Sequence, residues 1–327
     1  MCDPNTALET IEATAKATNT LGKIVEKIFG PSWKKKQADA ETYSAEVIMK
    51  MIRDNPDMDI IYNDSKLFIK KRDAIALANR ADERKALESV RQQYNLESVI
   101  GVAEASLDSK EKVNDKEVDE DFITRLFNIA KDANKKEMQF IWGKILAQEV
   151  LEPRSFSLRT LETVRNLSYR DAKIYQKIVP VVFNGARKKF IVSDDAILTK
   201  YGIKYEDVLL LDDCGLINSA GMLALTYGIE PNSEIYLHND EYVIFVKNTS
   251  ANKINLSIGA YTLKGSGVEL LKILYCDTNL NYIKDLVRYI KNKNSALKVT
   301  VHDIQKVNAD GSFNYSTLDI SSKFDIL

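Results

Sequence analysis

The chain has 327 residues, of which 45% are hydrophobic and 28% are charged. Its 46 Lys and Arg nearly balance its 47 Asp and Glu, so no net charge favours binding to DNA, RNA or an acidic membrane. Three separated cysteines and only two histidines argue against a zinc site and a disulfide framework, and we expect no metal and no cofactor. The first residues lack the pattern of a signal peptide, and no apolar run reaches the ~18 to 20 residues that span a bilayer, so we expect a cytoplasmic protein.

The N-terminal third is predicted to be helical and to mediate self-association. Residues 5–29 place apolar side chains at spacings of three and four, which is the pattern of an amphipathic helix. A Gly-Pro pair then breaks this helix, residues 31–55 continue helically, and residues 58–64 form a short extended piece. Residues 66–107 are predicted to be a long, charge-rich helical region. Because such a helix needs a partner surface, we expect a second copy of the chain, related by a two-fold axis, to cover it.

A polar, charged segment at residues 108–118 is the predicted linker. It separates a helical, oligomerising domain (1–107) from a four-helix segment (119–189), which is followed by an α+β domain (190–327). The predicted fold class is mainly α with a C-terminal α+β domain. It has long helices at the N-terminus, capped short helices in the middle, and a winged-helix-like or small antiparallel-sheet module at the C-terminus.

Polar residues mark the helix starts of the middle segment. Asp119 is a predicted N-cap, whose carboxylate would accept amide protons of the first turn. Asn134 and Glu137 have the spacing of a capping box, and Trp142 belongs to the apolar stripe of the helix that follows. The acidic run at residues 119–121 could instead hold a hard cation such as magnesium, but a helix N-terminus also favours negative charge.

The stretch "EPRSFSLRTLETVRNLS" has the pattern of two consecutive, tightly capped helices. With Ser157 as the N-cap, Phe156 and Leu161 have the spacing of a hydrophobic staple, which fixes the direction of the entering chain. Ser168 caps a further helix, with Asp171 in the capping-box position. A functional loop is the alternative interpretation of this stretch.

The chain changes character near Phe190, where short helices and strands begin to alternate. Two helices, over residues 193–202 and 205–217, are predicted to end at Gly202 and Gly215. A helix is predicted to start at Ser266. A second helix follows it and precedes the last long strand. The predicted strands cover residues 222–228, 234–238, 241–248, 253–263 and 297–307, with one more in the tail, and the last long helix covers residues 279–294.

Two groups of basic residues are candidate contacts to nucleic acid or to another anionic surface. The first follows Trp33 in the N-terminal region, and the second lies on the last predicted helix. Charge runs of this size are more often solvated faces, which is the favoured interpretation of both groups. The candidate residues are Lys34, Lys35, Lys36, Lys284, Arg288, Lys291 and Lys293.

Other motifs favour structural explanations. "KGSG" at residues 264–267 could seat a phosphate, but it lacks the spacing of a P-loop and suits a strand-to-helix turn. A catalytic nucleophile needs a base within hydrogen-bond reach, and His238 and His302 are predicted to be surface or sheet residues. The winged-helix-like part would place the helix at residues 205–217 in a DNA groove. That helix is acidic, which argues against direct reading of DNA.

Residues 117–178 contain "EMQFIWGKILAQE" and "PRSFSLRTLETVRNLS". This segment resembles an uncharacterised bacterial family that is defined only as a domain of unknown function, and "TLKGSGVELL" resembles its C-terminal part. Arg154 stands where the family usually has glycine. The N-terminal helices also resemble, more weakly, proteins of the abortive-infection type that act against phage. The resemblance implies a bacterial or prophage protein and brings no catalytic residues.

The leading functional prediction is a non-enzymatic interaction protein, a phage-defence sensor or effector that responds to a protein or phage-derived trigger. Two alternatives remain open at this point. One is a nucleic-acid-binding regulator that uses the winged-helix-like C-terminal part. The other is a membrane-active effector that makes peripheral membrane contact through the amphipathic residues 5–36.

Overall fold

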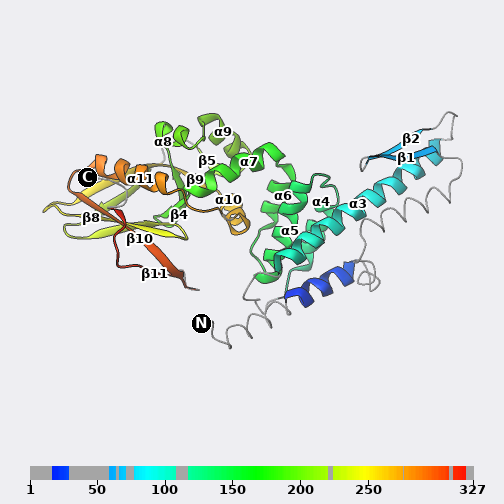
Figure 1. The fold of residues 1–327 in the computed structure, drawn as a ribbon, viewed down its shortest axis with the longest axis horizontal. Coiled ribbons are helices and arrows are strands. Elements are labelled where there is room, and N and C mark those ends of the chain that lie inside the picture. The colour runs from blue at the N-terminus through cyan, green and yellow to red at the C-terminus, as the bar shows by residue number, and fades with distance from the viewer. Residues whose placement is uncertain are drawn as a thin grey trace. The chain divides into compact units, whose positions relative to one another are not determined.

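The computed structural model describes residues 17–28, 59–63, 66–70, 77–107, 117–219, 224–274, 276–308 and 312–321. Contacts divide the chain into two compact units, Met1–Leu161 and Glu162–Leu327. The division falls inside a single helix, α6 (Leu158–Asn166). The described residues are mixed α/β, with helices dominating the first unit and an antiparallel sheet in the second (Figure 1).

The N-terminal unit is held together by helix packing. α3 (Leu77–Leu107) runs without a break through Gly101 and packs mainly against α5 (Lys136–Leu151), while α4 (Glu120–Ala130) contacts both. Residues 17–28 form another helix, within the region predicted to be amphipathic. Its buried side chains have helical spacing: Ala17, Leu21 and Val25.

A two-stranded hairpin precedes α3. β1 (Asp59–Asn63) lies in the segment predicted to be extended, and it pairs antiparallel with β2 (Lys66–Lys70). The prediction of helix over residues 66–107 is therefore wrong for its first five residues. The physical reason is visible in the sequence, because "KLFIK" is rich in residues that favour strands and a turn-forming Asp64-Ser65 pair precedes it.

Some predicted features lie outside the described residues. They include the Gly-Pro break, the helical segment at residues 31–55, and most of the linker, of which residues 108–116 are not described.

Two predicted N-caps of the first unit are confirmed by their hydrogen bonds. The Asp119 carboxylate accepts from the backbone amides of Asp121 and Phe122 at 2.9 and 3.1 Å, and α4 begins at the next residue. The Ser157 hydroxyl oxygen accepts from the Thr160 amide at 3.3 Å, and α6 begins directly after it. The acidic run at the start of α4 is thus used in helix capping.

The predicted capping box at Asn134 is wrong. α5 begins at Lys136 without a side-chain cap, because the Asn134 side chain has another partner. Its carboxamide oxygen accepts from Asn95 Nδ2 at 3.1 Å, and Asn95 Oδ1 accepts in turn from Gln139 at 3.0 Å. Asn95 and Gln139 are both buried, and this polar network satisfies their side chains between α3 and α5.

A buried carboxylate closes the corner between α5 and α6. Glu149 is 1% exposed and accepts from the backbone amides of Arg154 at 2.5 Å and Phe156 at 3.2 Å. Arg154 has a φ of 72°, in the left-handed region that favours glycine, the residue expected there from the family pattern. Trp142, Phe156 and Leu161 are all buried. These contacts favour the structural interpretation of the "PRSFS" corner.

The C-terminal unit is built on an antiparallel sheet that is larger than the predicted small module. Within the described residues it has nine strands in the order β11-β10-β8-β7-β3-β4-β9-β5, and β6 also pairs with β9. Its strands are β3 (Phe183–Gly185), β4 (Lys188–Val192), β5 (Ile217–Asn218), β6 (Ala224–Ile229), β7 (Glu234–His238), β8 (Tyr242–Asn248), β9 (Ile254–Leu263), β10 (Leu297–Val307) and β11 (Phe313–Tyr315).

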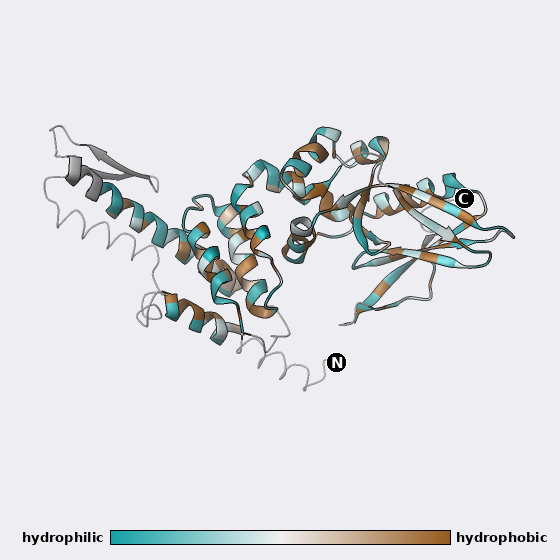
Figure 2. Ribbon diagram, turned by 180° about the vertical axis from the view of Figure 1, so that it is seen from behind, coloured by the Kyte–Doolittle hydropathy of each residue, from teal (hydrophilic) through white to brown (hydrophobic). Residues whose placement is uncertain are grey.

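Helices cover parts of this sheet. The longest, α11, packs against β10 and β9, and α7 packs against α9. Figure 2 shows hydrophobic and hydrophilic residues alternating along the strands, as expected of a sheet with one buried face. The helices are α7 (Tyr169–Ile178), α8 (Asp195–Lys200), α9 (Tyr205–Asp213), α10 (Gly265–Leu270) and α11 (Leu280–Lys293), with single 3-10 turns at Val179–Val181 and Leu271–Ile273.

Most of the predicted element ends of this unit are confirmed. Ser168 and Asp171 form the predicted capping box of α7, and Gly202 and Gly215 follow α8 and α9 with φ angles of 72° and 77°. The hairpin of β3 and β4 was not predicted. The predicted helix start at Ser266 is wrong, because α10 begins one residue earlier and the buried Ser266 hydroxyl is paired with Thr163 at 3.2 Å.

The closest approach of α3 and α5 yields a stability prediction. A Cβ added at Gly143 would lie 2.5 Å from the Val102 side chain and 2.8 Å from the carbonyl oxygen of Val99. We expect Gly143→Ala to lower the free energy of unfolding by about 1–3 kcal/mol, the cost of overpacking a dense contact. Urea unfolding of the full chain measures the change.

Gly101 on α3 provides the matched control, because a Cβ there would meet nothing within 4 Å. Gly101→Ala should raise the free energy of unfolding by about 0.5–1 kcal/mol, since alanine favours a helix over glycine by that amount. A stabilising effect at both positions would contradict the close packing of α3 against α5.

Candidate functional site

One face of the C-terminal sheet carries a group of rings that we call the aromatic face. Its members come from four strands that are neighbours at one end of the sheet, β7, β8, β10 and β11. Two of them are strongly exposed, Tyr236 at 52% and Tyr315 at 44%, and the others are half-buried. The aromatic face consists of Tyr236, His238, Phe245, His302, Phe313 and Tyr315.

Strand register places these rings on one side. Tyr236 pairs with Phe245, and Val243 pairs with both His238 and His302, so these residues project from the same face of the sheet. The residues between them along the strands project from the other face. They are buried on the side where α11 packs: Leu237, Ile244, Val246, Val299 and Val301.

The rings contact one another in an unbroken series. The Phe245 centroid lies 6.3 Å from that of Tyr236 and 5.1 Å from that of Tyr315. Phe313 lies 4.9 Å from His238 and 5.7 Å from Tyr236, with edge-to-face geometry in the second pair. Each ring therefore limits the rotation of its neighbours, and the aromatic face is a preformed surface.

An exposed apolar residue extends the aromatic face. Val307, at the end of β10, is exposed and pairs with Phe313 across the β10–β11 ribbon. Single exposed apolar residues are ordinary on protein surfaces, but a contiguous group of this kind marks a binding surface in many proteins.

The two histidines belong to the aromatic face as rings. Burial lowers the pKa of His238, and the positive charge of Lys189 lowers it further, against opposing effects of the Asn239 carbonyl and Asp240. His238 is therefore neutral at neutral pH. His302 is fixed through both ring nitrogens, by the Ser316 carbonyl at 2.9 Å and by the Thr300 hydroxyl at 3.1 Å.

Lysines lie at one end of the aromatic face. Lys247 and Lys298 are directly opposite each other on β8 and β10, in the row next to Tyr236 and Phe245. Glu234 on β7 completes this row and pairs with Lys247. Both lysines are exposed. Like charges placed directly across a strand pair disfavour the sheet, so this placement is a cost that folding alone does not explain.

Of the basic residues predicted from the sequence, those on α11 do not join the aromatic face. Lys34, Lys35 and Lys36 lie outside the described residues. Lys284, Arg288, Lys291 and Lys293 are on α11, which covers the opposite side of the sheet. Arg288 lies near Asp285, and the Lys293 ammonium lies 4.5 Å from the Tyr289 ring centroid.

The "KGSG" turn is used in packing. Lys264 Nζ donates to Asp212 Oδ1 at 2.5 Å, and Gly267 lies against the Leu216 backbone so closely that a Cβ would clash. The hydrogen bonds from Lys264 and Ser219 lower the pKa of Asp212 to about 2. These contacts join the end of α9 to the start of α10 and account for the glycine and lysine of the motif.

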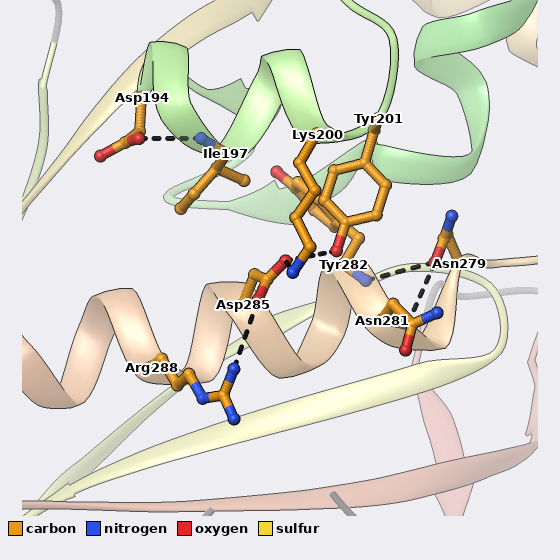
Figure 3. Close-up of polar contacts among 9 residues, drawn as sticks. All are labelled: Asp194, Ile197, Lys200, Tyr201, Asn279, Asn281, Tyr282, Asp285 and Arg288. Carbon is orange, nitrogen blue, oxygen red and sulfur yellow. Dashed lines mark hydrogen bonds and ion pairs between the residues drawn. The ribbon is translucent and has the colours of Figure 1, made fainter.

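Asp285 joins α11 to α8 (Figure 3). Its Oδ2 accepts hydrogen bonds from Lys200 Nζ at 2.5 Å and from the Tyr201 hydroxyl, and its Oδ1 lies 3.7 Å from Arg288 Nη1. The Tyr201 ring packs edge-on against the buried ring of Tyr282, with centroids 5.4 Å apart. The carboxylate thus has three donors around it.

The electrostatics of this cluster are those of a structural ion pair. Burial raises the pKa of Asp285, but the hydrogen bonds from Lys200 and Tyr201 outweigh burial and hold the pKa below its ordinary value of 3.8. Burial and the contact with Asp285 raise the pKa of Tyr201. At neutral pH the carboxylate is therefore ionised and the tyrosine protonated, so both keep their shared hydrogen bond.

Two features are absent from the part of the chain that the structure describes, a cluster of metal-ligand residues and a membrane-spanning helix. No group of three or more His, Cys, Asp or Glu residues there is placed to hold a metal ion. In the same residues, no helix combines the length and apolarity that crossing a membrane requires.

The sequence reasoning missed the aromatic face, although its signal is present. In "IYLH", "IFVK" and "LKVTVH", rings, lysine or threonine alternate with aliphatic residues. The alternation identifies strands, but the rings come together only through the pairing of β7 with β8 and β8 with β10. Pairing partners are a tertiary property that alternation within one strand does not specify.

The comparison with known families gives one match. The model of a family described as "Protein of unknown function (DUF2806)" matches residues 79–287, more than half of the chain. This confirms the resemblance to a domain of unknown function over residues 117–178. No curated protein and no solved structure matches the chain. The matched range includes β7 and β8 and ends within α11, so the rings of β10 and β11 lie beyond it.

The Asp285 cluster yields a prediction about stability and pH. Asp285→Ala should lower the free energy of unfolding by about 2–3 kcal/mol at pH 7, because it leaves Tyr201 without its charged acceptor. Because the folded-state pKa of Asp285 is depressed, its contribution is fully present above pH 3.8 and is lost as the pH falls through the folded-state pKa. The difference between variant and wild type should therefore shrink in acid.

Asp195→Ala is the control for this measurement, since Asp195 is an exposed carboxylate on α8, the helix that Asp285 of α11 contacts. Its effect should stay within about 0.5 kcal/mol. Urea unfolding at neutral and acid pH measures both variants. A pH-independent loss for Asp285→Ala would mean that its ion pairs contribute nothing to stability.

Proposed function

The chain belongs to the DUF2806 family, and we propose that it is a non-enzymatic interaction protein, a sensor or effector of phage defence, whose C-terminal unit binds its trigger through the aromatic face. The observation that carries this proposal is the contiguous set of rings, of which Tyr236 and Tyr315 are exposed. Aromatic residues dominate binding energies because a rigid ring buries a large area at little cost in entropy.

The assignment to phage defence rests on the resemblance to abortive-infection proteins. The proposal that the aromatic face is an interaction surface does not depend on that resemblance. A surface whose rings are already held by their neighbours loses little conformational freedom on binding, which favours recognition of a specific partner.

We also propose that the N-terminal unit associates with a second copy through α3. The C-terminal half of α3 buries Val99, Ile100 and Ala103, whereas Ala86 and Val90, earlier in the helix, are exposed or half-buried. A helix with an uncovered apolar stripe gains stability from a partner surface. This arrangement supports a self-associating effector whose state is changed by the trigger.

The self-association can be measured directly. Light scattering of the full chain at micromolar concentration should give a mass above that of one 37.0 kDa chain. Val90→Lys should lower the mass, because a charge would be buried in the contact, while Arg84→Lys on the exposed side of α3 should leave it unchanged. A monomeric mass for wild type would contradict this part of the proposal.

Two alternatives have less support. A winged-helix-like regulator would read DNA with α9, but that helix carries Glu206, Asp207, Asp212 and Asp213, which phosphate repels. A membrane-active effector would use residues 5–36. In the described part of that region, residues 17–28, Ala17, Leu21 and Val25 are buried, whereas Ile28 is exposed.

The proposed function is tested by phage challenge of bacteria that express the chain. We expect the wild type to lower the efficiency of plating of a sensitive phage by at least about tenfold. A double variant, Tyr236→Ser with Tyr315→Ser, should lose the protection, because exposed aromatic anchors supply most of the binding energy of an interface.

Tyr205→Ser is the matched control, because Tyr205 is equally exposed, at 50%, but lies on α9 outside the aromatic face. It should protect as well as the wild type. Protection that survives in the double variant would place the interaction surface elsewhere, and the absence of protection in every variant would remove the phage-defence function.

A further inference from the structure

We propose that the aromatic face binds single-stranded nucleic acid, with bases stacked on Tyr236 and Tyr315 and phosphates held by Lys247 and Lys298. This inference rests on the proposed function and names the chemical class of the trigger. It follows from three features of the aromatic face, which are the exposure of its outer rings, the position of its lysines and its place on the face of the sheet.

The outer rings are placed to stack bases. Tyr236 and Tyr315 are the exposed rings, and Phe245 lies between them at centroid distances of 6.3 and 5.1 Å. Phe245 and the two histidines pack against the outer rings. Every base has a flat π-face, so rings held in this way bind single strands with little dependence on sequence.

The lysines supply the charge that a backbone needs. Lys247 and Lys298 face each other across β8 and β10, next to the row of Tyr236 and Phe245. A phosphate between the two ammonium groups would relieve their repulsion, and Glu234 offsets only one of them. A positively charged groove beside stacking rings is the usual arrangement of proteins that bind single strands.

The charge of the aromatic face is uneven, and this fixes the path of the strand. Asp240 and Lys189 both lie near His238, so their charges offset each other there, and Asp319 lies near His302. The histidine end therefore has no excess of positive charge. The lysine end carries no such acid beyond Glu234 among the paired strand residues described. The backbone should therefore cross at Lys247 and Lys298, with bases directed toward the rings.

The geometry favours a single strand over a duplex or a peptide. A duplex hides the flat faces of its bases in its own stack, so exposed rings gain nothing from it. An extended peptide adds to the edge of a sheet through backbone hydrogen bonds. Tyr236 projects instead from the face of the sheet, and its strand, β7, is an interior strand paired with β3 and β8, whereas Tyr315 lies on the edge strand β11.

The test is fluorescence anisotropy of labelled oligonucleotides of about ten nucleotides, within the site sizes of comparable sheet surfaces. The full chain is titrated with oligo-dT, oligo-rU and a DNA duplex of equal length. We expect both single strands to bind at low salt and the duplex to bind at least about tenfold more weakly. Affinity for the single strands should fall as salt rises, because bound phosphates release counterions.

The variants assign the binding to this surface. Tyr236→Ala and Tyr315→Ala should each weaken single-strand binding by about tenfold, while Tyr236→Phe, which keeps the ring, should restore it. Lys247→Ala and Lys298→Ala should reduce the salt dependence. Tyr205→Ala on α9 and Lys284→Ala on α11 are matched controls and should bind as the wild type does. Thermal unfolding confirms that each variant is folded.

Three outcomes would overturn the inference. One is an absence of single-strand binding at low ionic strength. If the double variant, Tyr236→Ser with Tyr315→Ser, loses phage protection in that case, the aromatic face binds a protein and the proposed function is retained. Another is binding that depends on Lys284 but not on the rings. The last is a duplex that binds as tightly as a single strand. Oligonucleotide binding without phage protection would instead retain the inference and remove the proposed function.

Discussion

The two-residue alternation of paired strands governs the C-terminal unit more than any single contact. Because β7, β8 and β10 are in register, Leu237, Ile244 and Val301 lie on the side that α11 covers. The same register places Tyr236 and Phe245 on the other side. One pairing pattern thus builds the core and the binding surface together. A shift of one residue would expose the aliphatic face and bury the rings, so stability of the core selects for an intact surface.

The packing of the N-terminal unit depends on the close approach of α3 and α5 rather than on a large apolar stripe. Gly143 brings α5 against Val99 and Val102 of α3, and the buried Asn95 and Gln139 bond to each other across the same contact. Buried polar groups of this kind are favourable only when their partners are in place. They therefore specify one alignment of α3 and α5, which the apolar residues alone would fix less sharply.

Local signals predicted local structure well in this chain. The caps at Asp119, Ser157 and Ser168 and the glycine ends of α8 and α9 depend on side chains a few residues apart, and all are present. The failures had two causes. The Asn134 side chain bonds to Asn95, a distant residue on another helix, instead of capping α5. β2 was missed although its partner β1 is its immediate neighbour in the chain, because the helical pattern that follows was extended too far back. The aromatic face was missed for the first of these reasons, since its rings are brought together by strand pairing.

The pairing of β10 with β11 contains a bulge between Ile304 and Lys306. This extra residue reverses the phase of the strand, so that Val307 joins the side that carries Tyr315 and Phe313 instead of the opposite one. The number of residues at the bulge, rather than the identity of Gln305, therefore determines which side chains of the end of the ribbon lie on the side of the aromatic face. Inserting or deleting one residue at the bulge would move the side chains that follow it to the opposite side of the ribbon. The buried first half of β10 would keep its register. The ribbon can in this way diversify what it recognises at little cost to folding.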